Sequence, residues 1–122
     1  MGRPLPHPEG WGSVRKKIYE VEFIPEALFG VPYRKSLTTL FPRFLEAMAA
    51  RHEEDILAYF TDAFGYKCGV SECVGKMISL FSDLGVDMYF DEQVDEAAVK
   101  KVPVSSSLTQ DEIVKMLRAS MR

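Results

Sequence analysis

The chain has 122 residues, 47% of them hydrophobic, and a formal net charge of −3. This length suits one domain, and the apolar content is sufficient for a core. The acidic balance argues against a general nucleic-acid-binding protein, which is usually basic. No apolar run approaches the roughly 20 residues of a membrane-spanning helix, so we expect neither nucleic acid nor membrane as a partner.

Residues 1–13 are rich in proline and glycine, which predicts a flexible tail. Trp11 is the one tryptophan of the chain and lies in this tail. We expect it to anchor the tail on the body of the chain rather than to bind a partner.

Residues 14–30 are predicted to form a strand or an extended arm. Tyr19, Val21 and Phe23 alternate with two glutamates, a pattern typical of a half-buried strand. This half of the chain shows no second clear strand. The segment is therefore expected to pair with another chain or to lie extended over the helices.

Residues 31–66 carry two apolar helical stripes, which predict a helical hairpin. The first stripe consists of Leu37, Leu40, Phe41, Phe44, Leu45 and Met48. The second consists of Ile56, Leu57, Tyr59, Phe60, Ala63 and Phe64. A polar break at residues 51–53 separates them. Two short helices have too little core to be stable alone, so the hairpin is expected to pack against more of the chain or against a second copy.

Pro42 lies within the first stripe. Proline lacks the N–H that a helix interior uses and clashes with the carbonyl four residues earlier, except in the opening turn. We therefore predict that the regular helix begins with Thr38 or Thr39 as its N-cap and that Leu37 belongs to the preceding arm.

The hairpin resembles the RIIa docking-and-dimerisation module, best known from the type II regulatory subunit of cAMP-dependent protein kinase and also carried by ropporin-type and radial-spoke-type proteins. The matching positions are Val31-Pro32-Tyr33, Leu37-Thr38-Thr39-Leu40, Phe44, Met48, Asp55-Ile56, Tyr59 and Phe64. The chain departs from the family pattern at Glu53-Glu54, where the family has a proline, and at Ala63, where it has a tyrosine.

The resemblance implies a mainly α fold in which two hairpins, identical or related, form an X-type four-helix bundle. It also implies a groove that binds an amphipathic helix of an anchoring or spoke protein. The positions that match the groove are Val31, Tyr33, Leu37, Phe41 and Leu45. The positions that match the dimer and core side are Leu40, Phe44, Met48, Ile56, Tyr59 and Phe64. The alternative is that the later helices of the chain cover these faces and give a closed monomer.

Residues 67–122 are predicted to add further helices. A stripe from Cys73 to Leu84 predicts a helix with Ser71 as N-cap and Gly85 as the left-handed residue at its end. Residues 86–90 are expected to be a short strand or an extended link.

The last two predicted helices are marked by their caps. Asp91 is expected to cap a short helix that ends near Lys100-Lys101, where cations are favoured. Thr109 and Glu112 have the spacing of a capping box, which predicts a terminal helix.

The residues give few candidates for catalysis or metal binding. The acidic stretch 83–96 does not follow the EF-hand pattern, and a solvated face is favoured over a weak calcium site. Cys68 and Cys73 would point away from each other on one helix and lack the spacing of a zinc site. We expect a buried structural thiol at Cys73.

We therefore expect no cofactor, no metal and no catalytic residue. The expected function is that of a non-catalytic adaptor in a kinase-anchoring assembly or in a ciliary or flagellar axoneme. Two cysteines fit a reducing compartment, so we expect a cytoplasmic protein. The alternative is a small monomeric helical protein, or a thiol-dependent enzyme in which Cys68, next to Lys67, is the reactive group.

Overall fold

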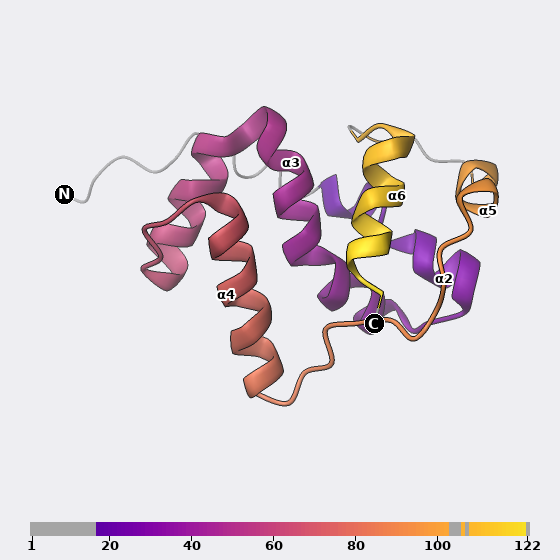
Figure 1. Ribbon diagram of the computed structural model, residues 1–122, viewed down its shortest axis with the longest axis horizontal. Helices are drawn as coiled ribbons and strands as arrows, with labels where there is room; N and C mark the ends of the chain where they lie inside the picture. Colours follow the sequence, from indigo (N-terminus) through magenta and orange to yellow (C-terminus); the bar gives the residue numbers. More distant parts are fainter. Residues whose placement is uncertain (1–16, 103–105, 107, 122) are drawn as a thin grey trace.

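The computed structural model describes residues 17–102, 106 and 108–121, which are mainly helical (Figure 1). The elements are η2 (Lys17–Glu20), α2 (Phe23–Phe29), α3 (Tyr33–Phe64), α4 (Val70–Asp83), α5 (Glu96–Lys101) and α6 (Gln110–Ala119). Within the described ranges, the isolated parallel bridge between Phe90 and Met121 is the one β-type pairing, so the mainly α fold is confirmed. The predictions for residues 1–13 and for Trp11 fall outside the described ranges.

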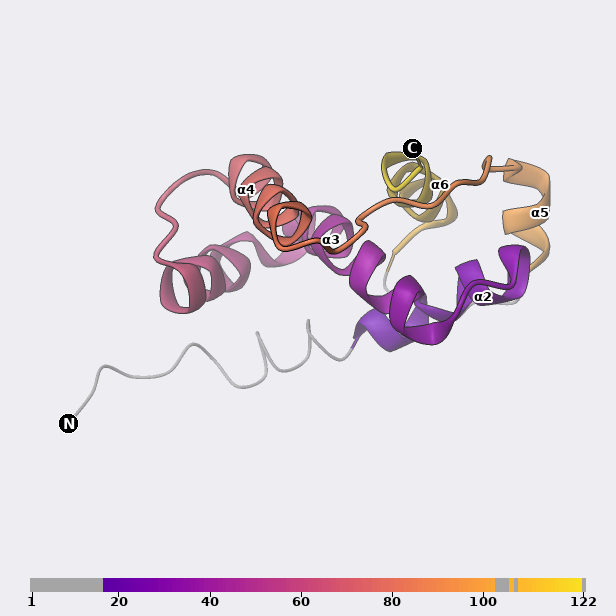
Figure 2. The same ribbon diagram turned by 90° about the horizontal axis from the view of Figure 1, so that it is seen from below.

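The long helix α3 is the centre of the arrangement. It bends at His52, whose φ of −136° and ψ of 36° are not helical, and this confirms the predicted break between two helical segments. The first half of α3 lies between α4 and α6, as both views show (Figures 1 and 2). The second half lies at one end of the molecule, and α2 and α5 lie at the other.

The segment predicted as a strand or extended arm is mostly helical in its described part, with a turn at residues 21–22. Residues 17–20 form η2 and residues 23–29 form α2. Ile18, Val21 and Ile24 are all buried, and their spacing of three places them on one helical face. The alternation with glutamates predicted a repeat of two residues, as in a strand. That prediction was wrong, because the side chains that form the core recur every third residue.

The start of α3 also differs from the prediction. The helix begins at Tyr33 after an extended Pro32, rather than at Thr38 or Thr39, and Leu37 belongs to the helix. Pro42 consequently lies in the helix interior, where it is buried. It leaves the carbonyl of Thr38 without the usual backbone donor. Tertiary packing outweighs this loss, because α3 is covered by α2, α4, α6 and η2.

The buried side chains of the helices form one hydrophobic cluster. α3 contributes Leu40, Phe44, Leu45, Met48, Ile56 and Phe60, and α6 contributes Ile113, Val114, Met116 and Leu117. Further members come from η2, α2, α4 and α5. The two apolar stripes of α3 are therefore covered largely within a single chain. None of the described helices is long and apolar enough to cross a bilayer.

The helix ends beyond α3 are set by local signals. The N-cap of α4 is Gly69, two residues before the predicted cap at Ser71. At its other end Gly85 has a φ of 89°. The N–H of Val86 donates to the carbonyl of Phe81, and that of Gly85 to Ser82. These two bonds form a Schellman motif, which confirms the predicted stop.

α5 and α6 differ in how well their starts were predicted. The N-cap of α5 is Asp95, whose carboxylate accepts from the N–H of Ala97, so the prediction of Asp91 was wrong by one helical turn. Lys100 and Lys101 lie in its last turn as expected. The capping box of Thr109 and Glu112 at the start of α6 is confirmed in full.

Candidate functional site

The positions predicted to face a groove divide into two groups. Leu45 is completely buried, with an exposed fraction of 0%. Tyr33 has an exposed fraction of 45%, and Val31, Leu37 and Phe41 are half-buried. A guest helix on this face can therefore contact the first part of α3 but not Leu45, and the placement of Leu45 in an open groove is corrected.

The positions predicted to face a dimer partner lie mostly inside the chain. Leu40, Phe44, Met48 and Ile56 have exposed fractions of 0–1%, and Tyr59 and Phe64 are half-buried. The four buried residues pack in the hydrophobic cluster of the single chain. These four are core positions, and of the six only Tyr59 and Phe64 are accessible to a partner.

Aromatic contacts connect the two halves of α3. The Phe41 and Tyr59 rings meet edge to face with centroids 6.4 Å apart. Tyr59 contacts Phe64 at 5.9 Å, and Phe64 stacks on Tyr66 at 5.3 Å. Lys76 of α4 lies 5.4 Å from the Tyr66 ring, within the range of a cation–π interaction. The bend at His52 is what brings the rings on the two halves together.

We name five apolar side chains on the two halves of α3 that are not fully buried the outer row. They are Tyr33, Leu37, Phe41, Tyr59 and Phe64; Tyr33 has an exposed fraction of 45%, and the other four are half-buried. The first three recur every fourth residue on one helical face. Tyr33, Leu37 and Phe41 were predicted to face the groove, and Tyr59 and Phe64 the dimer partner. The outer row therefore contains the accessible members of both predicted surfaces.

A buried guanidinium, which the sequence reasoning did not single out, ties α3 to the segment after α4. Arg43 has an exposed fraction of 4%. Its Nη1 donates to the carbonyl of Thr39 at 2.9 Å and to that of Met88. The Tyr89 ring lies 4.7 Å from its Cζ. Burial lowers the Arg43 pKa, and the neighbouring Tyr89 opposes this effect. A signal was present in the sequence, since Arg43 stands between Pro42 and Phe44 in an apolar stripe.

A buried carboxyl group lies at the other side of the start of α3. Glu22 has an exposed fraction of 8%, and its Oε2 has no hydrogen-bond partner among the described residues. Burial, together with the neighbouring Glu26, raises the Glu22 pKa to about 7. The Ser36 hydroxyl donates to the backbone carbonyl of Glu22, which links α3 to the start of α2. The side chain therefore keeps its proton at mildly acidic pH, where an ordinary glutamate is ionised.

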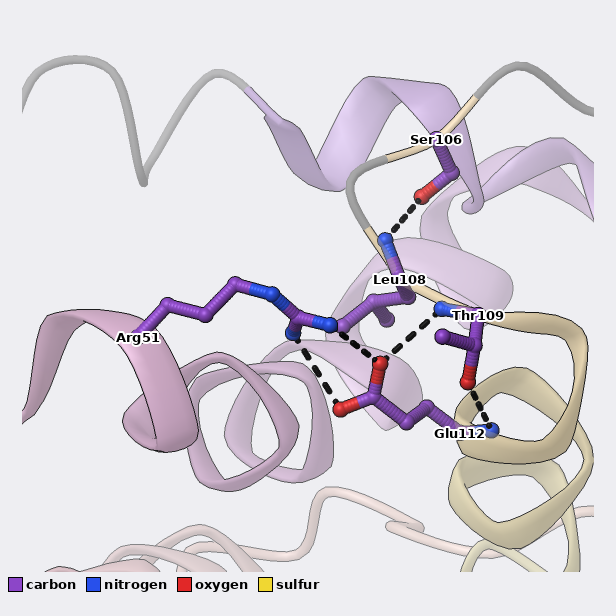
Figure 3. Close-up of polar contacts among 5 residues, drawn as sticks. All are labelled: Arg51, Ser106, Leu108, Thr109 and Glu112. Carbon is purple, nitrogen blue, oxygen red and sulfur yellow. Dashed lines mark hydrogen bonds and ion pairs between the residues drawn. The ribbon is translucent and has the colours of Figure 1, made fainter.

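The bend of α3 is joined to the start of α6 by a polar clamp that Figure 3 shows. Arg51 donates from Nη2 to Glu112 Oε1 at 2.7 Å and from Nη1 to Oε2 at 3.2 Å. Oε1 also accepts from the N–H of Thr109 at 2.9 Å, while the Thr109 hydroxyl accepts from the N–H of Glu112. The hydrogen bonds from Arg51 and Thr109 lower the Glu112 pKa to about 2. The capping box was predicted, but its long-range partner Arg51 was not.

The two cysteines lie close together, contrary to the prediction. Cys68 stands in the loop before α4 and Cys73 in the first turns of α4, so they do not share one helix. Their sulfur atoms are 3.2 Å apart. Cys73 is buried, as predicted. The hydrogen bond between the thiols is the main cause that raises the Cys68 pKa to about 11, which disfavours the thiolate expected of a reactive cysteine.

A cavity of about 380 Å³ lies between α3, the first turn of α4 and α6. Its lining consists of Arg43, Glu46, Ala47, Ala50, Ser71, Glu112, Lys115, Met116 and Ala119. Ser71 donates to Glu46 across its edge at 2.6 Å, which ties α4 to α3.

Groups of three or more histidine, cysteine or acidic side chains that are placed to hold a metal are absent from the described part of the chain, including the acidic stretch 83–96 there.

Comparison with known proteins returned no matching family model, no matching curated protein and no matching solved structure.

Proposed function

We propose that the chain is a non-catalytic adaptor that binds an amphipathic helix of a scaffold or anchoring protein and pairs with a second copy or a related hairpin. The observation that supports this proposal is the outer row. Five large apolar side chains on the two halves of α3 remain partly accessible, although Leu40, Phe44, Leu45, Met48, Ile56 and Phe60 of the two stripes are buried. Helix-in-groove recognition uses such a row, with anchors spaced by three or four residues.

The sequence resemblance to the docking-and-dimerisation module supports the same proposal and suggests its setting, a kinase-anchoring assembly or a ciliary or flagellar axoneme. The inner positions of that resemblance are occupied here by the chain's own core. In this proposal the guest helix therefore contacts Tyr33, Leu37 and Phe41, and the second copy contacts the Tyr59 and Phe64 end of the same row.

The proposal is tested with a fluorescent amphipathic peptide that has leucines at positions i, i+3, i+4 and i+7. Anisotropy gives its Kd, and light scattering gives the mass of the protein with and without peptide. We expect a dimer that binds the peptide. A scrambled peptide of the same composition, which has no apolar face, should not bind.

Matched substitutions place the peptide on the protein. Tyr33→Ala should weaken binding about tenfold, which is the effect of an aromatic anchor worth more than about 1 kcal/mol. Leu84→Ala is the control, because Leu84 has an exposed fraction of 69% but lies at the end of α4, outside the outer row. Equal losses in the two variants, or equal binding of the scrambled peptide, would contradict the proposal. A monomeric mass would contradict its dimerisation part.

A second test asks whether the chain's own residues 1–13 compete with the peptide for the outer row. A variant that lacks them distinguishes this case. If the tail covers the row, its removal strengthens peptide binding; if the row is open to partners, the Kd is unchanged.

A further inference from the structure

The cysteine pair is the part of the molecule with chemistry that the adaptor proposal does not use. The chain has two cysteines in all, and both belong to this pair. Cys68 is half-buried and Cys73 is buried. The Cys73 thiol donates toward the carbonyl of Cys68 at 3.4 Å, and the two sulfur atoms lie 3.2 Å apart.

The geometry leaves little movement between this pair and a covalent bond. A disulfide has a sulfur–sulfur distance of about 2.0 Å, so the two atoms must approach by little more than 1 Å. Cys73 is fixed on α4, where its N–H donates to the carbonyl of Gly69 at 2.9 Å. Cys68 lies outside the helices, in the loop between the end of α3 at Phe64 and the start of α4 at Val70, so its backbone is not held in a helix. The loop can therefore supply the movement while α4 stays in place.

We propose that Cys68 and Cys73 are a redox modification site that forms a reversible intramolecular disulfide with a small-molecule disulfide as the oxidant. In the first step the Cys68 thiol loses its proton to water and its sulfur attacks one sulfur of the oxidant. The oxidant's S–S bond breaks, its other half leaves as a thiolate and takes a proton, and a mixed disulfide remains on Cys68.

The second step closes the protein disulfide. Cys73 loses its proton, its sulfur attacks Cys68 Sγ, and the second half of the oxidant leaves as a thiolate that takes a proton. In sum, two protein thiols are oxidised to one disulfide, and one small-molecule disulfide is reduced to two thiols. The order follows from exposure, because an oxidant in solvent reaches the half-buried Cys68 before the buried Cys73.

The surroundings set the rate of the first step. The hydrogen bond between the thiols raises the Cys68 pKa most, burial and a hydrogen bond with Glu72 raise it further, and Lys76 acts in the opposite direction. The thiolate is the attacking species in disulfide exchange. The first step is therefore slow near neutral pH and becomes faster as the pH rises toward about 11.

The site is tested with oxidised glutathione on the full chain at pH 8.5, with intact mass as the readout. The wild-type protein should lose the mass of two hydrogen atoms, become resistant to iodoacetamide at both positions, and return to its starting mass with dithiothreitol. The mixed disulfide should be at least about tenfold less abundant than in C73S, since Cys73 resolves it.

Two variants keep the outcome decisive. C73S should stop at the mixed disulfide and gain one glutathione, while C68S should remain unmodified because its one thiol is buried. Far-UV circular dichroism confirms that each variant is folded. Stable glutathionylation of the wild-type protein, or a disulfide between two chains in place of the internal one, would overturn the proposal. These readouts do not involve the outer row, so they are independent of peptide binding.

Discussion

Glu22 and Glu112 flank the first half of α3, and their pKa values move in opposite directions. The Glu112 carboxylate is partly exposed, with donors from Arg51 and Thr109, and its pKa falls to about 2. The Glu22 carboxyl is almost completely buried with one oxygen unpaired, and its pKa rises to about 7. The same functional group thus loses its proton only above about pH 7 at one site and is already ionised above about pH 2 at the other.

Glu22 and Glu112 differ both in burial and in their hydrogen-bond partners, and Arg43 shows which of the two factors matters. It is as buried as Glu22, but it donates to two backbone carbonyls and faces the Tyr89 ring. Burial alone opposes a charge, whereas burial with fixed hydrogen-bond partners is tolerated. The comparison therefore predicts that the effect of a substitution depends on whether it leaves a buried group without its partner.

The largest effect is expected for Arg43→Ala. It leaves the carbonyls of Thr39 and Met88 without their donor and opens space beside Tyr89, so the free energy of unfolding should fall by about 2–4 kcal/mol. Urea unfolding followed by circular dichroism measures this loss.

Lys35→Ala is the matched control for Arg43→Ala. Lys35 also joins α3 to the segment after α4, through Asp87, but this ion pair is partly exposed. Its removal should change stability by less than about 1 kcal/mol. Equal losses for the two variants would show that burial of the guanidinium contributes nothing.

A smaller effect, which depends on pH, is expected for Glu22. In the unfolded chain a glutamate titrates near 4.5, whereas in the fold Glu22 keeps its proton up to about 7. The folded state therefore binds more protons between these values, and stability falls as the pH rises from about 4.5 to about 7. The loss should be on the order of 1–3 kcal/mol.

Glu22→Gln tests this assignment, because the neutral amide has no charge to desolvate. The variant should be more stable than wild type at pH 8 and similar to it at pH 4.5. Midpoints of urea unfolding across this range provide the measurement. A wild-type profile that stays flat between pH 4.5 and 7 would contradict the assignment.

The smallest effect is expected at the clamp, and its pH dependence has the opposite sign. Glu112 is ionised in the fold down to a pH of about 2, so the stability it contributes is present above pH 4.5 and is lost between about 4.5 and 2. Because solvent screens this partly exposed pair, Glu112→Gln should cost only about 1 kcal/mol at pH 7.

Two further variants divide the clamp into its parts. Thr109→Ala removes one half of the capping box and leaves Arg51 in place, whereas Arg51→Met removes the ion pair and leaves the box. We expect the loss in Arg51→Met to diminish in high salt and the loss in Thr109→Ala to persist. The reverse dependence on salt would contradict the division.

The sequence predicted helix ends better than it predicted contacts between helices, because helix ends depend on local signals. The Thr109–Glu112 box and the stop at Gly85 depend on bonds between near neighbours, so the sequence contains all of their partners. The break at residues 51–53 was predicted because polar residues there interrupt the apolar stripes, which is also a local feature of the sequence. Arg51, in contrast, reaches Glu112 from another helix, and no spacing along the chain indicates that pair.

The errors have a common physical cause, which is that burial was assigned before the covering element was known. Leu45 was placed in an open groove because two helices cannot cover both stripes of a hairpin, but α3 is also covered by α6 and α2. The cysteines were separated by assuming one helix, although Gly69 ends the loop between them. Residues 19–23 were assigned to a strand because apolar and acidic residues alternate there. The buried side chains from η2 to α2, however, recur every third residue, as in a helix.

The bend at His52 fixes how many residues must stand between the two halves of α3. An α-helix turns by about 100° with each residue, so one inserted or deleted position between Phe41 and Tyr59 would rotate the downstream aromatic rings off their shared face. The spacing of these two rings is therefore a length constraint that an amino-acid preference at any single site does not express. Variation in chain length is better accommodated in exposed connections between helices, such as residues 91–93.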